Sequence, residues 1–200
     1  MTEPRVSPAL EEWRTANLAP RGKPDDRLGL QLCDDDDAER LWRAFGHNLA
    51  FVVGKGWGVW TGAKWDFVEG RQRAREYGAR LRRLVQAEAK AAARSEIDDV
   101  TAQRFIAAKR DAAAGRGARQ GALAIPEDLE DAKALMRRER AAELYKHAER
   151  CGSLSKINAA LELLEHRALR PLDAFDADPW RVAALNGVID LRKVAEEPPE

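Results

Sequence analysis

The sequence predicts an α+β fold that is mostly helical, with a small β-meander and a C-terminal β-hairpin flanking a helical bundle. Short β-branched or aromatic runs separated by Gly-rich turns occupy residues 49–68. From Gly70 apolar residues recur with a period near 3.6, through a last stripe of Ile157, Leu161 and Leu164, which is typical of helices. Near the C-terminus, Asn186-Gly187 joins two β-like runs, and this dipeptide is a strong hairpin signal.

The chain is expected to begin with a flexible segment over residues 1–33, which hold four of the nine prolines and little apolar periodicity. The run Asp34–Asp37 then opens a short helix, because carboxylates favour the first turn and cap its free N–H groups. We interpret this run as a capping segment in preference to a metal site. Leu41, Trp42 and Phe45 give the helix an apolar stripe, and Gly46 ends it.

The meander is expected to have three strands, near residues 49–53, 57–61 and 64–68. One long Arg- and Ala-rich helix follows from Gly70 to about Arg94. Its expected apolar face contains Tyr77, Leu81, Leu84 and Val85.

Three more helices are predicted before the C-terminal hairpin. They run from about residue 99 to 114, from Ile125-Pro126 to Cys151-Gly152, and onward from a cap at Ser153 or Ser155. The low-complexity stretch 112–122 is expected to be a mobile connection.

The charge is balanced overall but unevenly distributed, with 34 basic and 34 acidic residues. Residues 71–120 contain thirteen basic and six acidic side chains, whereas both ends of the chain are acidic. A basic middle can attract a polyanion or an acidic partner surface, although a solvated Arg-rich helix face has the same composition. No apolar run is long enough to span a membrane, and the two distant cysteines suit a reducing compartment, so we expect a cytoplasmic protein without membrane contact.

Motifs for catalysis or cofactor binding are missing from the sequence. There is no phosphate-binding loop of the P-loop type, no H-E-x-x-H and no pair of C-x-x-C motifs. We therefore expect no metal, no cofactor and no catalytic residue in this chain. A minimal primase or nuclease is the enzymatic alternative, and its candidate carboxylates are Asp176, Asp178 and Asp190.

Two ordered clusters of residues carry a family resemblance. The first comprises Phe45-Gly46, Trp57, Trp60, Gly62 and Trp65, and the second comprises Asp176, Asp178-Pro179-Trp180, Asn186-Gly187 and Asp190-Leu191-Arg192. Together they resemble, over about residues 34–193, the domain that precedes the helicase in phage, plasmid and poxvirus-type primase-helicases. Thr61 departs from the family's usual Asp at that turn.

The resemblance implies a role in DNA replication, as part of a phage or plasmid mobile element. In that family the domain links a primase, where one is present, to a superfamily-three ATPase helicase. It therefore implies a non-catalytic module that couples assembly and single-stranded DNA handling to the motor. ATP and Mg²⁺ are expected only for a helicase module missing from this chain, to which residues 194–200 would be a tail or the start of a linker.

Candidate DNA contacts follow from the resemblance and the local charge. Trp57 and Trp60 are three residues apart, so they lie on opposite strand faces, and the outward one can stack on a base. The candidate cations are Arg71, Arg73, Arg75, Arg82, Arg83, Lys109 and Arg110, with Arg71, Arg75 and Arg82 expected on one helix stripe. The alternative is a soluble face whose arginines pair with Glu76, Glu88 and Asp99.

The expected partners are single-stranded DNA, bound weakly and without sequence preference, the helicase and primase modules, and a second copy of the chain. A structural role is expected for the family-motif residues Phe45, Gly46, Trp65, Asp178, Pro179, Trp180, Asn186, Gly187, Asp190 and Leu191. The competing hypothesis is a protein-only oligomerisation or adaptor domain that makes no DNA contact.

Overall fold

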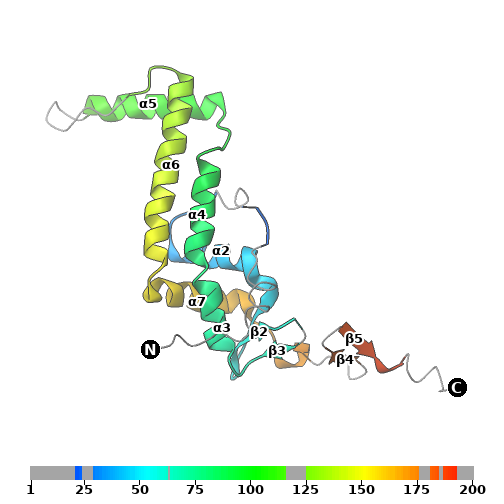
Figure 1. Cartoon of the computed structure of the whole chain (residues 1–200). Coiled ribbons are helices and arrows are strands. Elements are labelled where there is room, and N and C mark those ends of the chain that lie inside the picture. The colour runs from blue at the N-terminus through cyan, green and yellow to red at the C-terminus, as the bar shows by residue number, and fades with distance from the viewer. Residues whose placement is uncertain are drawn as a thin grey trace, which may run out of the picture. The chain divides into compact units, whose positions relative to one another are not determined.

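The computed structural model describes residues 21–23, 29–62, 64–115, 125–175, 181–184 and 187–192. Within them, the chain forms helices, one small antiparallel sheet and a two-stranded hairpin near the C-terminus (Figure 1). The predicted fold class is thereby confirmed. Most of the expected flexible lead-in, part of the expected mobile connection and the segment 176–180 lie outside the described residues.

The helices are α2 (Asp34–Phe45), α3 (Gly70–Gly78), α4 (Leu81–Ala92), α5 (Asp99–Gly115), α6 (Leu129–Cys151) and α7 (Leu154–Ala168), with short 3₁₀ turns η2 (Gly46–Asn48) and η3 (Leu172–Phe175). The strands are β1 (Leu49–Val52), β2 (Gly56–Trp60), β3 (Trp65–Asp66), β4 (Arg181–Ala184) and β5 (Gly187–Asp190). None of the helices in the described segments is long and apolar enough to cross a bilayer.

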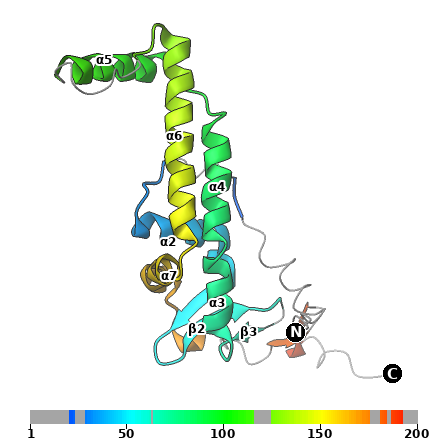
Figure 2. The ribbon, with the colours of Figure 1, turned by 60° about the vertical axis from the view of Figure 1, so that its left-hand side comes forward.

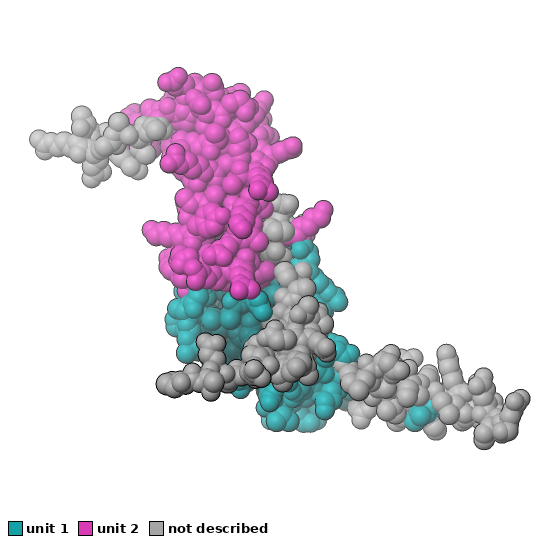
Figure 3. All heavy atoms as spheres, viewed as in Figure 1, with its two compact units in different colours: residues 1–22, 31–81, 151–200 teal, residues 23–30, 82–150 magenta. Residues whose placement is uncertain are grey.

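The chain divides into two compact units, coloured separately in Figure 3. Unit 1 comprises residues 1–22, 31–81 and 151–200, and unit 2 comprises residues 23–30 and 82–150. All six tryptophans of the sequence belong to unit 1. Tryptophan fluorescence therefore reports on unit 1.

The sheet of unit 1 is an antiparallel meander in the order β1-β2-β3. Its register places Phe51 opposite Trp57 and Trp60 opposite Trp65. The chain leaving α7 extends the sheet on the β1 side: Leu169 forms a parallel bridge with Phe51, and the backbone N–H of Arg170 donates to the Phe51 carbonyl at 2.9 Å. The three predicted strands are confirmed, with ends that differ by at most two residues.

Helices α2, α3 and α7 of unit 1 pack against one another, and α3 and α7 also pack on the sheet. Gly70 starts α3 directly against β2, where a Cβ atom would lie only 1.8 Å from the carbonyl oxygen of Trp57. Phe45 packs on Tyr77 with ring centroids 5.1 Å apart. The buried apolar side chains of this core include Leu41, Phe45, Leu49, Val59, Tyr77, Leu81, Leu161 and Leu164.

The single long helix predicted from residue 70 to 94 is wrong, because the structure breaks it after Gly78. The amide of Arg80 donates to the carbonyl of Tyr77, an i to i−3 bond that tightens the end of α3. Gly78 faces α7, and a Cβ there would lie 2.7 Å from a methyl carbon of Ile157. The break thus occurs where two helices approach closely, a contact that the local sequence does not show.

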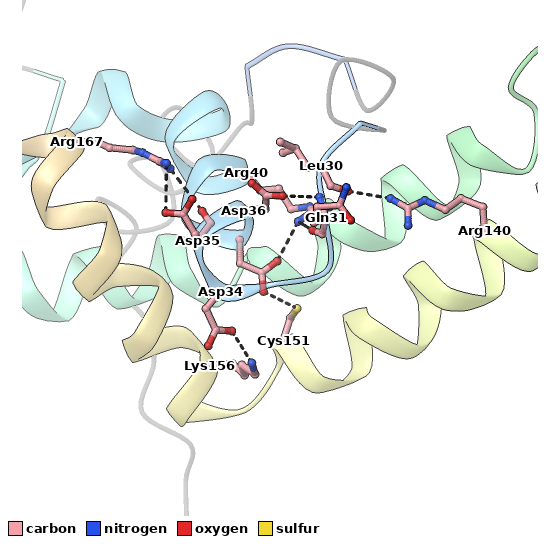
Figure 4. A network of polar contacts seen from close by, with 11 residues as sticks. Leu30, Gln31, Asp34, Asp35, Asp36, Arg40, Arg140, Cys151, Lys156 and Arg167 are labelled. Carbon is pink, nitrogen blue, oxygen red and sulfur yellow. Dashed lines mark hydrogen bonds and ion pairs between the residues drawn. The ribbon is translucent and has the colours of Figure 1, made fainter.

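The acidic run at the start of α2 forms a network of polar contacts (Figure 4). Asp34 pairs with Lys156 and Asp35 pairs with Arg167, both on α7. The residue at the N-cap position is Cys33, which makes no side-chain cap. The prediction that the aspartates cap the helix is therefore wrong in this respect: two of them bind the neighbouring helix instead.

Asp37 and Arg40 form a buried ion pair within α2. The guanidinium Nη1 of Arg40 lies 3.2 Å from Asp37 Oδ1, and the two side chains are 0 % and 1 % exposed. The same Nη1 donates to the carbonyl oxygen of Gln31 at 2.7 Å. A buried charge of this kind is stable only while its partner is present.

Unit 2 is built from α4, α5 and α6, with α4 and α6 running alongside each other (Figure 2). The ion pair between Arg82 and Glu149 joins one pair of their ends. Near the other end, Arg137 donates to the carbonyl of Ser95, so the two helices are antiparallel.

The predicted helix boundaries in this part of the chain largely agree with the structure. Helix α5 covers the predicted range, and α6 starts shortly after Pro126 and ends at Cys151. Asp128 accepts from the amide of Asp131 at 2.9 Å, which caps the first turn of α6. Of the two serines proposed to cap α7, Ser153 does so by accepting from the amide of Lys156.

Candidate nucleic-acid interface

Four half-buried aromatic side chains form a cluster at the β2–β3 side of the sheet in unit 1. The ring centroids of Trp60 and Trp65 are 5.7 Å apart. Phe175 of η3 makes edge-to-face contacts with both Trp65 and Phe67, each at 5.3 Å. We call Trp60, Trp65, Phe67 and Phe175 the aromatic cluster.

Strand geometry and glycines place these rings. Trp65 stands on β3, and Phe67 follows directly after the end of that strand. The ring of Phe67 covers Gly58, where a Cβ would lie 2.5 Å from the ring.

Gly62 turns the chain between β2 and β3 with φ of +98°, a conformation that L side chains rarely adopt. The Thr61 hydroxyl, which departs from the family pattern, donates across this turn to the Lys64 carbonyl at 2.8 Å.

Cationic side chains occur beside the aromatic cluster and on α3. The ammonium of Lys55 lies 5.9 Å from the centroid of the Phe67 ring, within the range of a cation–π contact. Arg71 and Arg75 are exposed on α3, one helical turn apart, and neither has an ion-pair partner among the described residues. Such side chains can bind phosphate oxygens without first breaking an internal pair.

Three of the predicted DNA-binding cations are instead engaged in ion pairs. Arg73 pairs with Asp66 and Glu69 in unit 1. Arg82 pairs with Glu149, and Lys109 pairs with Glu139 while its ammonium lies over the ring of Phe105. These acidic partners differ from the predicted ones, and Glu88, one of those predicted, is fully buried.

The predicted stripe of Arg71, Arg75 and Arg82 is also wrong. It assumed one continuous helix, but Arg71 and Arg75 belong to α3 whereas Arg82 belongs to α4. The two remaining cations in the prediction, Arg83 and Arg110, are exposed on helices of unit 2.

Trp57 and Trp60 have different environments, as their odd separation predicts. Trp57 is buried and packs edge-to-face on Phe51 with centroids 5.5 Å apart, so its ring is not accessible to a base. Its assignment as a DNA-contacting residue is therefore corrected to a core role. Trp60 is half-buried in the aromatic cluster.

Phe67, Phe175 and Lys55 were not predicted as site residues. The alternation of β3 could have identified Phe67, since it follows Trp65 by two positions. Phe175 reaches the cluster only because the chain after α7 returns along β1, and no local pattern indicates that contact.

The family-motif residues of the first cluster have structural positions. Phe45 is buried against Tyr77, and a Cβ on Gly46 would lie 2.5 Å from the indole of Trp42. In the second cluster, Gly187 and Asp190 are paired in the β4–β5 ladder, while Leu191 is partly exposed. The other residues predicted in this cluster lie outside the described residues: Asp176, Asp178, Pro179, Trp180 and Asn186. Asp176 and Asp178 are two of the three carboxylate candidates.

Two titratable groups in the core of unit 1 are held neutral at physiological pH. Burial, followed by the nearby Asp37 carboxylate, raises the pKa of the Cys151 thiol to about 12. That thiol donates to Asp37 Oδ2 at 3.7 Å. Burial also raises the pKa of Tyr77. A protonated, buried thiol is a poor nucleophile, so Cys151 is suited to packing.

Comparison with known proteins gives one match. The family model described as D5 N terminal like matches residues 38–198, which is most of the chain. No curated protein and no solved structure matches the chain.

Proposed function

The chain belongs to the D5 N-terminal-like family, the pre-helicase domain of primase-helicases, and we propose that it is a non-catalytic module that holds single-stranded DNA for the adjoining replication enzymes. In this proposal the module couples its own assembly and DNA contact to a superfamily-three helicase. ATP and Mg²⁺ serve that helicase and not this chain.

The aromatic cluster is the observation on which the proposal rests. Half-buried rings held by their neighbours can stack on bases of any sequence, and each stacked base contributes about 1–3 kcal/mol. Lys55 beside Phe67 and the unpaired arginines of α3 supply positive charge on the same unit. Stacking rings together with cations that contact phosphates are the two components of sequence-independent single-strand binding.

Titration of a labelled oligothymidylate, followed by anisotropy and by tryptophan quenching, tests the proposal. We expect salt-dependent binding accompanied by quenching, because the tryptophans are in the unit that carries the cluster. Trp65→Ala should weaken binding about tenfold, the equivalent of one stacked base. The matched control is Tyr145→Ala, which removes a partly exposed aromatic ring from unit 2 and should leave the affinity unchanged.

A second titration tests the phosphate contacts of α3. The double variant Arg71→Gln, Arg75→Gln should reduce the slope of log affinity against log salt by about 1.4, since each contact with a single strand contributes about 0.7. Binding that is equal at low and high salt, or no binding at either, contradicts the DNA-binding part of the proposal.

An adaptor domain that contacts only protein is the second candidate. It is favoured by the ion pairs of Arg73, Arg82 and Lys109, and by exposed apolar residues near the cluster in sequence: Val68 is 96 % exposed and Leu172 is 51 % exposed. Light scattering separates the two candidates. A monomer that binds the oligonucleotide supports the DNA-handling module, whereas a dimer or ring that binds no oligonucleotide supports the adaptor.

A further inference from the structure

Helix α4 of unit 2 carries three exposed cations without ion-pair partners among the described residues. They are Arg83, Lys90 and Arg94, the last of which stands in the turn that ends the helix. The neighbouring Arg82, in contrast, is held by Glu149. We call Arg83, Lys90 and Arg94 the α4 stripe.

The spacing of the α4 stripe follows from helix geometry. Separations of seven and four residues place all three side chains within an arc of about 40° around the helix axis. The corresponding rises are about 10.5 Å and 6 Å. These rises are comparable with the distances between nearby phosphates along a strand, so the three cations can contact phosphates of one backbone. The three cations therefore form a straight row with a spacing that suits a phosphate backbone.

The charge of this row is not neutralised by its own helix. The only acidic residue of α4 is Glu88, which is fully buried and thus absent from the surface. On α6, the helix running alongside, Glu149 is engaged with Arg82. The exposed face of α4 is consequently cationic from its first turn to its end.

The composition of this face distinguishes between two kinds of acidic partner. Protein interfaces have aromatic or large apolar residues at their centre, whereas nucleic-acid interfaces are polar and positively charged. None of the large exposed apolar side chains found in the described residues lies on α4. The face therefore lacks the apolar anchors that an acidic protein partner needs.

We propose that the α4 stripe is a second nucleic-acid contact, which binds the phosphates of a single strand and reads no bases. The inference rests on the proposed DNA-handling function but concerns a different unit from the aromatic cluster. It adds a phosphate contact on unit 2 to the stacking contact on unit 1.

The test compares two triple variants of the full chain with equal loss of charge. Arg83→Gln, Lys90→Gln, Arg94→Gln removes the α4 stripe, and we expect the salt slope for oligothymidylate to fall by about 2 while quenching at saturation persists. The control, Arg138→Gln, Lys146→Gln, Arg150→Gln, removes three exposed cations without ion-pair partners from α6 of the same unit. It should retain the wild-type slope.

The readouts separate failure of this inference from failure of the proposed function. Suppose that the oligonucleotide still quenches the fluorescence but the two triple variants have the same salt slope, whether lowered or unchanged. The α4 stripe is then not a specific contact, and this inference fails while the proposed function stands. If the wild-type chain binds no oligonucleotide, both fail. An acidic polypeptide is titrated in parallel with the oligonucleotide. If the chain binds both with equal affinity and the α4 triple binds neither, the α4 stripe accepts an acidic protein, and the inference is overturned. The single variant Lys90→Gln should lower the slope by about 0.7, which provides a milder second measurement.

Discussion

Replacing the buried Asp37 by Asn tests what holds α2 in unit 1. The substitution keeps the size of the side chain and removes its charge, so it breaks the ion pair between the Asp37 carboxylate and the guanidinium of Arg40, whose side chain is 0 % exposed. Breaking a buried pair in this way costs about 3–5 kcal/mol of unfolding free energy. The same substitution two residues earlier, Asp35→Asn, breaks a pair whose carboxylate is 66 % exposed. Surface pairs contribute about 0–1 kcal/mol, so this variant is the matched control.

Urea denaturation followed by tryptophan fluorescence measures both variants, because the fluorescence arises from unit 1 alone. A loss of 3–5 kcal/mol corresponds to a fall in Tm of roughly 6–20 °C for a chain of this size. If Asp37→Asn proves no more destabilising than Asp35→Asn, the buried pair is not a main support of α2. The argument from burial would then be refuted, since the two changes differ chiefly in exposure.

Three further outcomes follow from the structure of unit 1. Gly70→Ala should destabilise it by about 1–3 kcal/mol in the same urea assay, because its Cβ meets the β2 backbone. Because the folded pKa of Cys151 lies near 12 and its ordinary value is 9.0, the unfolded chain loses that proton first. The contribution of the protonated thiol to the free energy of unfolding is therefore fully present below about pH 9 and is lost as the pH rises toward 12. The Cys151→Ser variant should show a smaller decline in stability over this range. Phe175→Ala removes an edge contact from Trp65, so acrylamide should quench the tryptophan emission more efficiently.

The sequence predicted those features of the fold that have local causes. The meander, the capped start of α7 and the C-terminal hairpin each follow from residues within a few positions of one another. The break after Gly78 does not, since its neighbour Ile157 lies on a helix 79 residues further along the chain. Apolar periodicity continues across the break, with Tyr77 and Leu81 both buried, so periodicity alone could not reveal it.

The candidate site was predicted in part for the same reason. Arg73 could have been recognised as paired, because Glu69 stands four residues before it, at the N-cap position of the same helix. The partner of Arg82, Glu149, is 67 residues away, and no spacing rule identifies it. Trp57 and Trp60 could be assigned to opposite faces by parity, but only tertiary packing shows that the face of Trp57 is the buried one.

The length of oligonucleotide that the chain needs provides a test of whether both proposed contacts bind one strand. The α4 stripe from Arg83 to Arg94 rises about 16 Å along the helix. An oligothymidylate of about six nucleotides, within the usual range of single-strand site sizes, therefore suffices for either contact alone. A longer strand that reaches both contacts binds the second one intramolecularly. Its affinity should then increase by a much larger factor than the number of binding positions on the strand does. We expect the affinity to rise steeply once the oligonucleotide is long enough to reach both contacts, and this rise to be lost in both the Trp65→Ala variant and the α4 triple. A smooth statistical increase, unchanged in these variants, would mean that the aromatic cluster and the α4 stripe do not share a strand.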